Sequence, residues 1–471
     1  MAGGTSQALY QARIPIYPRS VKGRFRTLKW GILVLAYGVY FLLPWLRWER
    51  AIGIPQAVAF DIEGRRFYLF NLVVHAQDIF WLAGLLVIAA LLLFFVTGIA
   101  GRVFCGYFCF QTLWTDLYIL IERLVQGERV ARIRLDNQPW NGEKIFKKLS
   151  THLLWLLVGF WTGFTFTLYW GNAPQLFGEF FTGSAPFPAY ATTLFLMFTT
   201  YVMAGLAREQ VCTYMCPYAR FQGAMFDRDT LIVAYDEKRG EGEAGRHKIA
   251  RGFKSKEDRE IDGAGDCIDC GYCVQVCPTG IDIRNGMQYQ CISCALCIDA
   301  CDTIMDSLNW PRGLIKYTSE KAQQGEKTRF LTAKNIGYGV SLVAAVVALI
   351  YSVVAQIPFD FSVAQVRQPL FVEMSDGRIQ NSYELKINNK TDRSVPFVLE
   401  QEGLPAAELD LGHLQNLHLQ PEQNLRLLVR VRVNPQAMPT NPVEFRFRIR
   451  MSGDTDVFLL EQPTFFHKPA R

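Results

Sequence analysis

Charged residues are missing from several long stretches of this 471-residue sequence, although they make up 20% of all residues. A soluble fold could reach the overall apolar fraction of 50%, but it would not gather its apolar residues into uninterrupted runs of this length. The missing charge therefore excludes an ordinary soluble protein and indicates segments that cross a lipid bilayer.

Acidic residues are absent from the N-terminus, where residues 1–29 carry six Lys and Arg and no Asp or Glu. Such an arm is found in nucleic-acid-binding tails, in signal peptides and on the cytoplasmic flank of membrane helices. The apolar run that follows is longer than the core of a signal peptide, and no small-residue cleavage site comes after it. We therefore interpret residues 1–29 as a cytoplasmic anchor and expect no nucleic-acid partner.

Cysteine is absent from residues 302–471, and all twelve cysteines fall in three tight groups earlier in the chain. The groups are Cys105 with Cys109, Cys212 with Cys216, and eight cysteines between 267 and 301. A secreted disulfide scaffold would spread its cysteines over the fold. The grouping excludes such a scaffold and indicates metal binding in a reducing compartment.

Five apolar stretches are long enough to cross a bilayer, which takes about 20 residues. All five are free of Asp, Glu, Lys and Arg, and the third contains His152. The expected helices cover residues 30–46, 79–101, 151–170, 188–207 and 335–357. We therefore predict a membrane protein with five spans, surrounded by lipid.

Basic residues in the connecting segments predict how the spans are oriented. Segment 102–148 holds eight Lys and Arg against five acids, whereas segment 47–78 holds four of each. This bias places the N-terminus, 102–148 and 208–334 in the cytoplasm, and 360–471 in the periplasm. The expected location is the inner membrane of a bacterial cell.

The most specific pattern is a repeated cysteine motif inside the segment 258–312. The stretch 267–278 has the bacterial ferredoxin spacing C-x-x-C-x-x-C-x-x-x-C-P, and 291–301 repeats it without the proline. Three thiolates of each run hold one 4Fe–4S cluster, and the fourth reaches the neighbouring cluster. The expected ligands are Cys267, Cys270, Cys273 and Cys301 for cluster 1, and Cys291, Cys294, Cys297 and Cys277 for cluster 2. Zinc ribbons are the alternative, but they use two cysteine pairs rather than a triplet with a remote fourth ligand.

A second repeat lies where the second and fourth spans end. It consists of Arg102 before Cys105 and Cys109, and of Arg208 before Cys212 and Cys216. If continuous helices carry these pairs, the i, i+4 spacing puts both thiols of a pair on one face. Four converging thiolates suit Cu(I), zinc or an iron–sulfur centre, and a neighbouring arginine helps to ionise a thiol. A redox dithiol is the alternative.

Residues 360–471 change to an alternating pattern. Segments 425–433 and 445–451 place apolar residues on one strand face and arginines on the other, and 383–387 alternates in the same way. Several such strands within about 100 residues predict a β-sandwich. We expect this sandwich to serve as a docking module.

These motifs together resemble the FixG/RdxA/CcoG family, bacterial membrane proteins that assist the assembly of cbb-type cytochrome c oxidase. The resemblance rests on the span order, the double ferredoxin motif, Cys-Gly-Tyr-Phe-Cys at 105–109 and Cys-Thr-Tyr-Met-Cys-Pro at 212–217. It implies an immunoglobulin-like outer domain and a cupric reductase whose paired cysteines handle copper. Its implied partners are oxidase subunits or copper chaperones. One departure is Phe110, where the family has proline.

The predicted fold class is a polytopic α-helical membrane protein, N-terminus inside and C-terminus outside, with a ferredoxin module and a β-sandwich. Its expected regions are 1–29, 30–207 with four spans, 208–334, the fifth span at 335–357, and 360–471.

Three function classes follow from these features. The leading hypothesis is an oxidoreductase in which two 4Fe–4S clusters take electrons from a cytoplasmic donor and reduce Cu(II) to Cu(I) at the paired cysteines. A quinol-linked electron-transfer protein is the second class, and the third is an assembly scaffold whose clusters only stabilise the fold. The sequence names neither the donor nor the oligomeric state.

Overall fold

The computed structural model divides the chain into two compact units. The first comprises Met1–Trp48 and Ile54–Leu349, and the second comprises Glu49–Gly53 and Ile350–Arg471. The structure describes residues 15–50, 53–62, 64–75, 78–249, 256–391, 393–412, 418–438, 440–452 and 457–469. The first half of the predicted basic arm, residues 1–14, lies outside the described residues.

Five helices of the described chain are long and apolar enough to cross a membrane, which confirms the predicted number of spans. They are α1 (Arg24–Leu42), α2 (Ile79–Ala100), α6 (Gly142–Leu168), α8 (Phe187–Thr200) and α15 (Ala333–Val354). Of the 18 most apolar consecutive residues in each helix, only 6% are buried inside the protein in α2 and none in α15. Apolar helices that are this exposed require a hydrocarbon solvent, because water would leave their surfaces unfavourably hydrated.

α6 is longer than its apolar run predicts, whereas α8 and the segment after it cover the predicted span 188–207. α6 begins at Gly142, where the side chain of Asn141 accepts a hydrogen bond from the backbone N–H of Lys144 and caps the helix. α8 continues into a π-helical segment, η3 (Tyr201–Ala207). The polar first turns of α6 therefore extend beyond the predicted span, which starts at residue 151.

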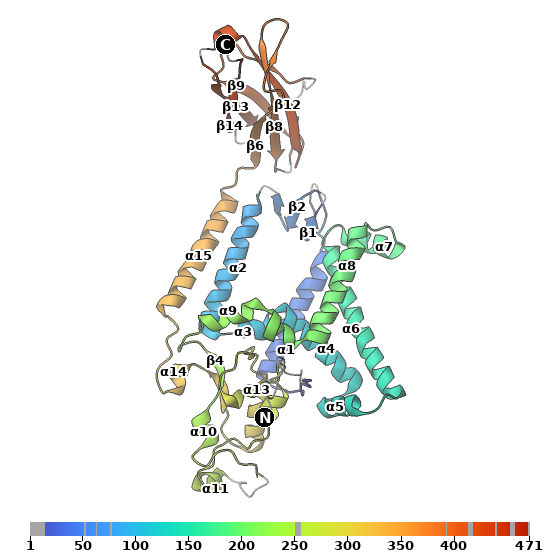
Figure 1. Ribbon diagram of the computed structural model, residues 1–471, viewed down its shortest axis with the longest axis vertical. Helices are drawn as coiled ribbons and strands as arrows, with labels where there is room; N and C mark the ends of the chain where they lie inside the picture. The colour runs from blue at the N-terminus through green and yellow to red at the C-terminus, as the bar shows by residue number, and fades with distance from the viewer. Residues whose placement is uncertain are drawn as a thin grey trace, which may run out of the picture. The chain divides into compact units, whose positions relative to one another are not determined.

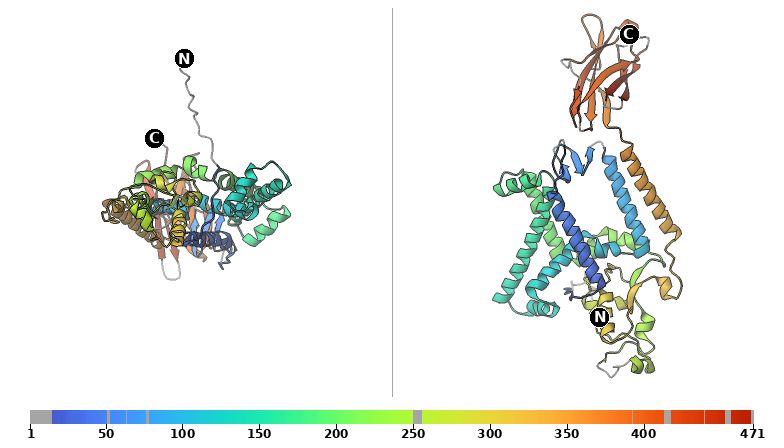
Figure 2. Two further views of the ribbon diagram at one scale, coloured as in Figure 1. Left: turned by 90° about the horizontal axis from the view of Figure 1, so that it is seen from below. Right: turned by 180° about the vertical axis from the view of Figure 1, so that it is seen from behind.

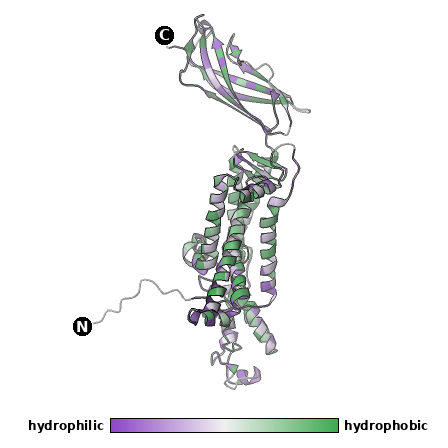
Figure 3. Ribbon diagram, turned by 90° about the vertical axis from the view of Figure 1, so that its right-hand side faces the viewer, coloured by the Kyte–Doolittle hydropathy of each residue, from purple (hydrophilic) through white to green (hydrophobic). Residues whose placement is uncertain are grey.

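The connecting elements of the first unit gather at the two ends of the spans, whose residues are mostly hydrophobic (Figures 1 and 3). One end carries the helix α7 and a three-stranded antiparallel sheet, and the other carries the helices that connect the spans. The former are β1 (Val58–Asp61), β2 (Arg66–Leu69), β3 (Leu72–His75) and α7 (Ala173–Thr182). The latter are α3 (Val103–Tyr107), α4 (Phe110–Gln126), α5 (Arg129–Asn137) and α9 (Pro217–Met225).

The cysteine-rich segment lies at the same end as α3 and α9 (Figure 2). Its main elements are the antiparallel pair β4 and β5 and the helices α12 and α13, which follow the two cysteine loops. They are β4 (Ile232–Tyr235), α10 (Glu237–Glu241), α11 (Lys256–Ile261), α12 (Tyr272–Gln275), η6 (Ile283–Asn285), α13 (Leu296–Ser307), β5 (Ile315–Thr318) and α14 (Glu320–Gln323).

The described part of the basic arm holds this segment against the spans. The backbone N–H groups of Phe25 and Arg26 donate to the carboxylate of Asp299 on α13, at 3.2 and 2.7 Å. The Arg26 guanidinium also donates to both carboxylate oxygens of Asp116 on α4, at 2.9 and 2.8 Å. Since all these groups except Phe25 are buried, the arm is a structural connection as well as a charged flank.

The second unit is a β-sandwich, as the alternating pattern predicts. One sheet has the order β10-β12-β8-β6 with β7 beside β8, and the other has the order β11-β9-β13-β14. The strands are β6 (Phe359–Gln365), β7 (Val372–Glu373), β8 (Ile379–Asn389), β9 (Val395–Glu402), β10 (Glu408–Asp410), β11 (His418–Leu419), β12 (Asn424–Val433), β13 (Val443–Ser452) and β14 (Val457–Phe466). Inward residues of both sheets, including Val429 and Phe447, form one buried core.

A core truncation in the sandwich tests whether the two units unfold separately. Phe447 is fully buried, so Phe447→Ala should lower the free energy of unfolding of the second unit by about 3–5 kcal/mol. Phe465→Ala is the control, because that side chain is 49% exposed and should cost far less. Calorimetry of the whole protein should show one transition moving while the iron–sulfur absorbance persists. Loss of that absorbance at the lowered temperature would contradict separate unfolding.

Candidate metal centres

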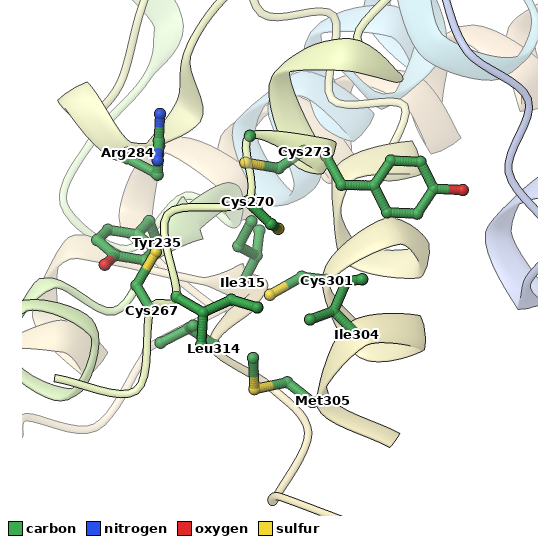
Figure 4. A pocket seen from close by; sticks show the side chains of 13 residues that line it. Tyr235, Cys267, Cys270, Cys273, Arg284, Cys301, Ile304, Met305, Leu314 and Ile315 are labelled. Carbon is green, nitrogen blue, oxygen red and sulfur yellow. The ribbon is translucent and has the colours of Figure 1, made fainter. Parts of the chain in front are cut away.

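The cysteines predicted for cluster 1 surround one cavity. Their sulfur atoms point toward a common space of about 370 Å³ (Figure 4). Cys267 and Cys270 come from the loop before α12, Cys273 comes from α12 itself, and Cys301 comes from α13. Ile304, Leu314 and Ile315 complete the apolar part of its lining.

The cysteines predicted for cluster 2 surround a second cavity of about 360 Å³. Cys291, Cys294 and Cys297 line it from the second loop and the start of α13, and Cys277 lines it from the end of the first motif. Cys273 borders both cavities, so the two spaces are neighbours. Their nearly equal volumes suit two groups of the same kind.

The two cysteine loops share an unusual backbone conformation. Asp269 and Gly271 in the first loop have positive φ angles, and Ser293 and Ala295 have them at the same places in the second. Three of these four residues are not glycine, so each loop holds a conformation that most side chains disfavour. The repeat in sequence is therefore a repeat in geometry, and it turns the thiols of each loop inward.

Burial makes these thiols unfavourable as free anions. It raises the pKa of Cys273 and of Cys291 to about 12, and it raises the pKa of Cys294, Cys297 and Cys301 as well. Bound iron supplies the positive charge that lets buried thiols ionise. The donor set of four sulfurs in each dry cavity fits a 4Fe–4S cluster, and the ligand assignment by residue stays a prediction.

The paired cysteines do not lie on continuous helices, contrary to the expected i, i+4 arrangement. Cys105 is on the short helix α3, but the chain breaks after Tyr107, and Cys109 is the extended residue before α4. Likewise Cys212 is in the π-helical turn η4 (Val211–Met215), and Cys216 is the extended residue before α9. Each pair therefore joins a helical turn to the N-terminus of the next helix.

The backbone at the second cysteine is the same in both pairs, despite the missing proline. Cys109 has φ −65° and ψ 127°, and Cys216 has φ −78° and ψ 110°. Phe110 and Pro217 both occupy the first position of the following helix, where proline is favoured because its N–H is not needed. Phenylalanine at 110 leaves that geometry intact and stacks on Trp114 with ring centroids 4.0 Å apart.

The four paired thiols lie within electrostatic range of one another. Burial, followed by the charges of Cys109 and Cys105, raises the pKa of Cys212 to about 12. Burial likewise raises the pKa of Cys105, to which Cys109 and Cys216 contribute. We call these four residues the four-thiol site. In the described ranges no three Cys, His, Asp or Glu side chains already converge on the position of a single ion.

The four-thiol site packs against the loop of cluster 2. Gly106 lies so close that an added Cβ would be 2.8 Å from the carbonyl oxygen of Ile292 and 2.9 Å from the Cα of Cys294. The Tyr107 hydroxyl donates to the carbonyl of Cys294 at 3.1 Å. Cys105 and Cys294 belong to the same buried cluster, so cluster 2 is the one nearer to the four thiols.

Models of three protein families match this chain. A "4Fe-4S dicluster domain" matches residues 207–320, and a "4Fe-4S binding domain" matches residues 81–126. Residues 349–469 match the "IG-like fold at C-terminal of FixG", whose description names a candidate oxidoreductase. Together these matches show 4Fe–4S binding and an immunoglobulin-like domain.

Curated relatives match over most of the chain. Protein RdxB of Cereibacter sphaeroides is 45% identical over 82% of this chain and 81% of its own. Protein RdxA of the same organism is 42% identical over 84% of each chain, and the nitrogen fixation protein FixG of Rhizobium meliloti is 40% identical over 85% and 82%. The chain belongs to the FixG/RdxA/RdxB family. This FixG-family protein is thus a multi-pass iron–sulfur protein and a candidate oxidoreductase.

Two partners of the cysteine motifs in this FixG-family protein, Gln222 and Glu122, are not indicated by any pattern in the sequence. The Sγ–H of Cys105 donates to the Oε1 of Gln222 at 3.2 Å, and the Nε–H of Arg102 donates to the same oxygen at 3.1 Å. No spacing rule singles out Gln222, which lies within α9. The two motif arginines also differ, because Arg208 forms an ion pair with Glu122 instead.

A third cavity, of about 350 Å³, lies beside the four-thiol site. Cys212 lines it from the four-thiol site, and Thr279 lines it from the segment that follows Cys277. Its other walls carry charges of both signs. They are Lys29, Asp116, Arg208 and Glu209. This lining differs from that of the two cluster cavities by its several charged side chains.

Alanine at position 106 should disturb cluster 2 selectively. Its Cβ would press on the backbone of the Cys291–Cys297 loop, where an overpacked contact costs about 1–3 kcal/mol. We expect Gly106→Ala to lower the iron content toward one cluster per chain, measured by anaerobic metal analysis and electron paramagnetic resonance (EPR). Gly223→Ala on α9 is the control, because nothing lies within 4 Å of its added Cβ. Full iron content in Gly106→Ala would refute the close contact.

Proposed function

We propose that this protein reduces Cu(II) to Cu(I) at the four-thiol site and so supplies copper for the maturation of a cbb-type cytochrome c oxidase. The observation that carries the proposal is the packing of Gly106 and Tyr107 against the loop of cluster 2. Bound clusters would relay single electrons, and each Cu(II) takes one electron to become Cu(I). A cytoplasmic one-electron donor of the ferredoxin or flavoprotein class would supply it.

Sulfur ligands explain why reduction would occur at this site. Thiolates are soft ligands that favour Cu(I) over Cu(II), so the four sulfurs stabilise the product. Cys109 and Cys216 stand at the N-termini of α4 and α9, where the helix dipole favours negative charge. The cavity beside Cys212 brings charged side chains of both signs next to this thiol.

We also propose the orientation that the basic residues predict. In it the cluster segment faces the cytoplasm of a bacterial cell and the immunoglobulin-like domain faces the periplasm. The chain enters the sandwich directly after α15, which fits a domain on the side opposite to the clusters. Oxidase subunits or copper chaperones are the partners proposed for that domain.

A third iron–sulfur cluster is the competing occupant of the four-thiol site. The family model described as a 4Fe–4S binding domain matches residues 81–126, in which Cys105 and Cys109 are the only cysteines. Iron for three clusters per chain in the purified protein would support this reading. Iron for two clusters, with copper bound after Cu(II) is added under reducing conditions, would support the reductase.

Replacement of the second pair separates copper chemistry from cluster assembly. Cys212→Ser together with Cys216→Ser should abolish the reduction of Cu(II), because two of the four soft ligands are lost. The EPR signals of clusters 1 and 2 should persist, since neither residue borders their cavities. Full copper reduction by the double variant would rule out this site.

Copper binding should become tighter as the pH rises. Burial and neighbouring thiols hold the pKa of Cys212 near 12 and raise that of Cys105, so both are protonated at neutral pH. Metal binding must release these protons, and the apparent affinity should therefore rise about tenfold per pH unit for each proton released. Competition with a Cu(I) chelator between pH 6 and pH 8 measures this slope. Cys212→Ser should flatten it, and a pH-independent affinity would contradict thiolate binding.

A further inference from the structure

Arg102 is a buried cation that lacks an acidic partner. Its side chain is almost fully covered, with 4% of the residue exposed. The guanidinium donates to Gln222 at 3.1 Å and to the backbone carbonyl of Tyr289, whose ring it also approaches at 5.6 Å. Within the described part of the chain it forms no ion pair with a carboxylate. A buried charge of this kind requires negative charge nearby.

The negative charge available to Arg102 is that of cluster 2, whose ligands would be ionised once iron is bound. Arg102 lines a cavity of about 600 Å³ together with Cys291, a predicted ligand of this cluster. Its positive charge lowers the pKa of Cys291, Cys105 and Cys212, against the larger effect of burial. Arg102 therefore lies between cluster 2 and the four-thiol site, within electrostatic range of both.

The cations near cluster 1 have carboxylate partners. Arg284 donates to Asp282 at 2.8 and 2.6 Å and to Asp269 at 2.6 Å. Arg239 pairs with Asp266 at 2.6 Å. The same Asp266 attracts Arg259, which donates to the backbone carbonyl of Cys267 at 3.0 Å.

Cluster 1 also has an acid beside its fourth ligand. Asp302 follows Cys301 directly and, after burial and the neighbouring thiols, contributes to raising the pKa of that thiol. The second cation near cluster 2, Lys29, is partly offset by Asp116 at 3.7 Å. The clearest difference between the two environments is therefore the uncompensated charge of Arg102.

We propose that the positive charge of Arg102 holds the reduction potential of cluster 2 above that of cluster 1. Reduction adds negative charge to a cluster, and a buried cation without a counterion stabilises that charge. An electron shared by the two clusters would then reside mainly on cluster 2, beside the four thiols. This direction of flow rests on the proposed function, whereas the order of the potentials does not.

Two variants remove the charge by different routes. Arg102→Gln deletes it, and Gln222→Glu neutralises it with hardly any change of shape, because the Gln222 oxygen already accepts from Arg102. Either variant should shift the electron equilibrium between the clusters on the order of tenfold toward cluster 1. For a one-electron couple, tenfold corresponds to about 59 mV.

The measurement is an anaerobic redox titration of the full chain in detergent, followed by EPR. Cys270→Ser and Cys297→Ser assign the signals to clusters 1 and 2. Arg208→Gln is the matched control from the second motif: Arg208 pairs with Glu122 and should not affect either potential. We expect both charge variants to lower the potential of cluster 2 alone.

Several results would overturn the proposal. They are equal or reversed potentials in the unmodified protein, no shift in either charge variant, or equal shifts of both clusters. If Arg102→Gln fails to assemble its clusters, Gln222→Glu decides the question alone. Copper reduction is assayed separately, so a protein that shows the expected potentials but does not reduce Cu(II) would refute the proposed function and leave the role of Arg102 standing.

Discussion

A backbone contact that only glycine permits joins the two cysteine systems of this protein. Gly106 stands between Cys105 and Cys109 and lies against the backbone of Ile292 and Cys294. Electron transfer slows steeply with distance, so two redox sites are useful to each other only when the chain between them is this closely packed. The neighbouring Tyr107 fixes the same approach through its hydrogen bond to the carbonyl of Cys294. The four-thiol site thus derives its role from its position rather than from its sulfur atoms alone.

Charge balance explains why this contact is surrounded by buried ionic groups. Thiols removed from water resist ionisation, and a cluster ligand must nevertheless be an anion. Arg102 and Lys29 bring positive charge to this region. Asp116 forms ion pairs with both Lys29 and Arg26. Burial alone would raise the pKa of Asp116, but Lys29 and Arg26 outweigh it and lower that pKa. The N-terminal arm therefore contributes to the electrostatics of the metal centres as well as to their attachment to the spans.

Sequence reasoning succeeded where spacing along the chain determines geometry. The length of the uncharged stretches predicted the five spans, because a helix in lipid is apolar over its whole length. The alternation of apolar and polar residues predicted the sandwich, because the two faces of a strand meet different environments. The cysteine spacing predicted two sets of four ligands, and each set lines one cavity, but Cys273 lines both cavities and the ligand assignment by residue stays a prediction. It failed for the paired cysteines, since an i, i+4 spacing does not reveal that the helix breaks at Phe108 and again before Cys216. The contacts of Gln222 could not be predicted from the sequence, because its partners Arg102 and Cys105 are distant along the chain and meet it only after folding.

The two thiol pairs repeat one motif, yet their surroundings have diverged. The first pair is turned inward: Cys105 is buried, Gly106 touches the loop of cluster 2, and Arg102 reaches Cys291. In the second pair both cysteines are partly buried, and Tyr214 and Met215 between them are 69% and 64% exposed. On the proposed function, the first pair would receive the electron and the second pair would meet the ion. A thioether is a soft copper ligand, so an exposed Met215 is chemically suited to that side. Two copies of one motif in different surroundings are enough to create a site with two distinct approaches.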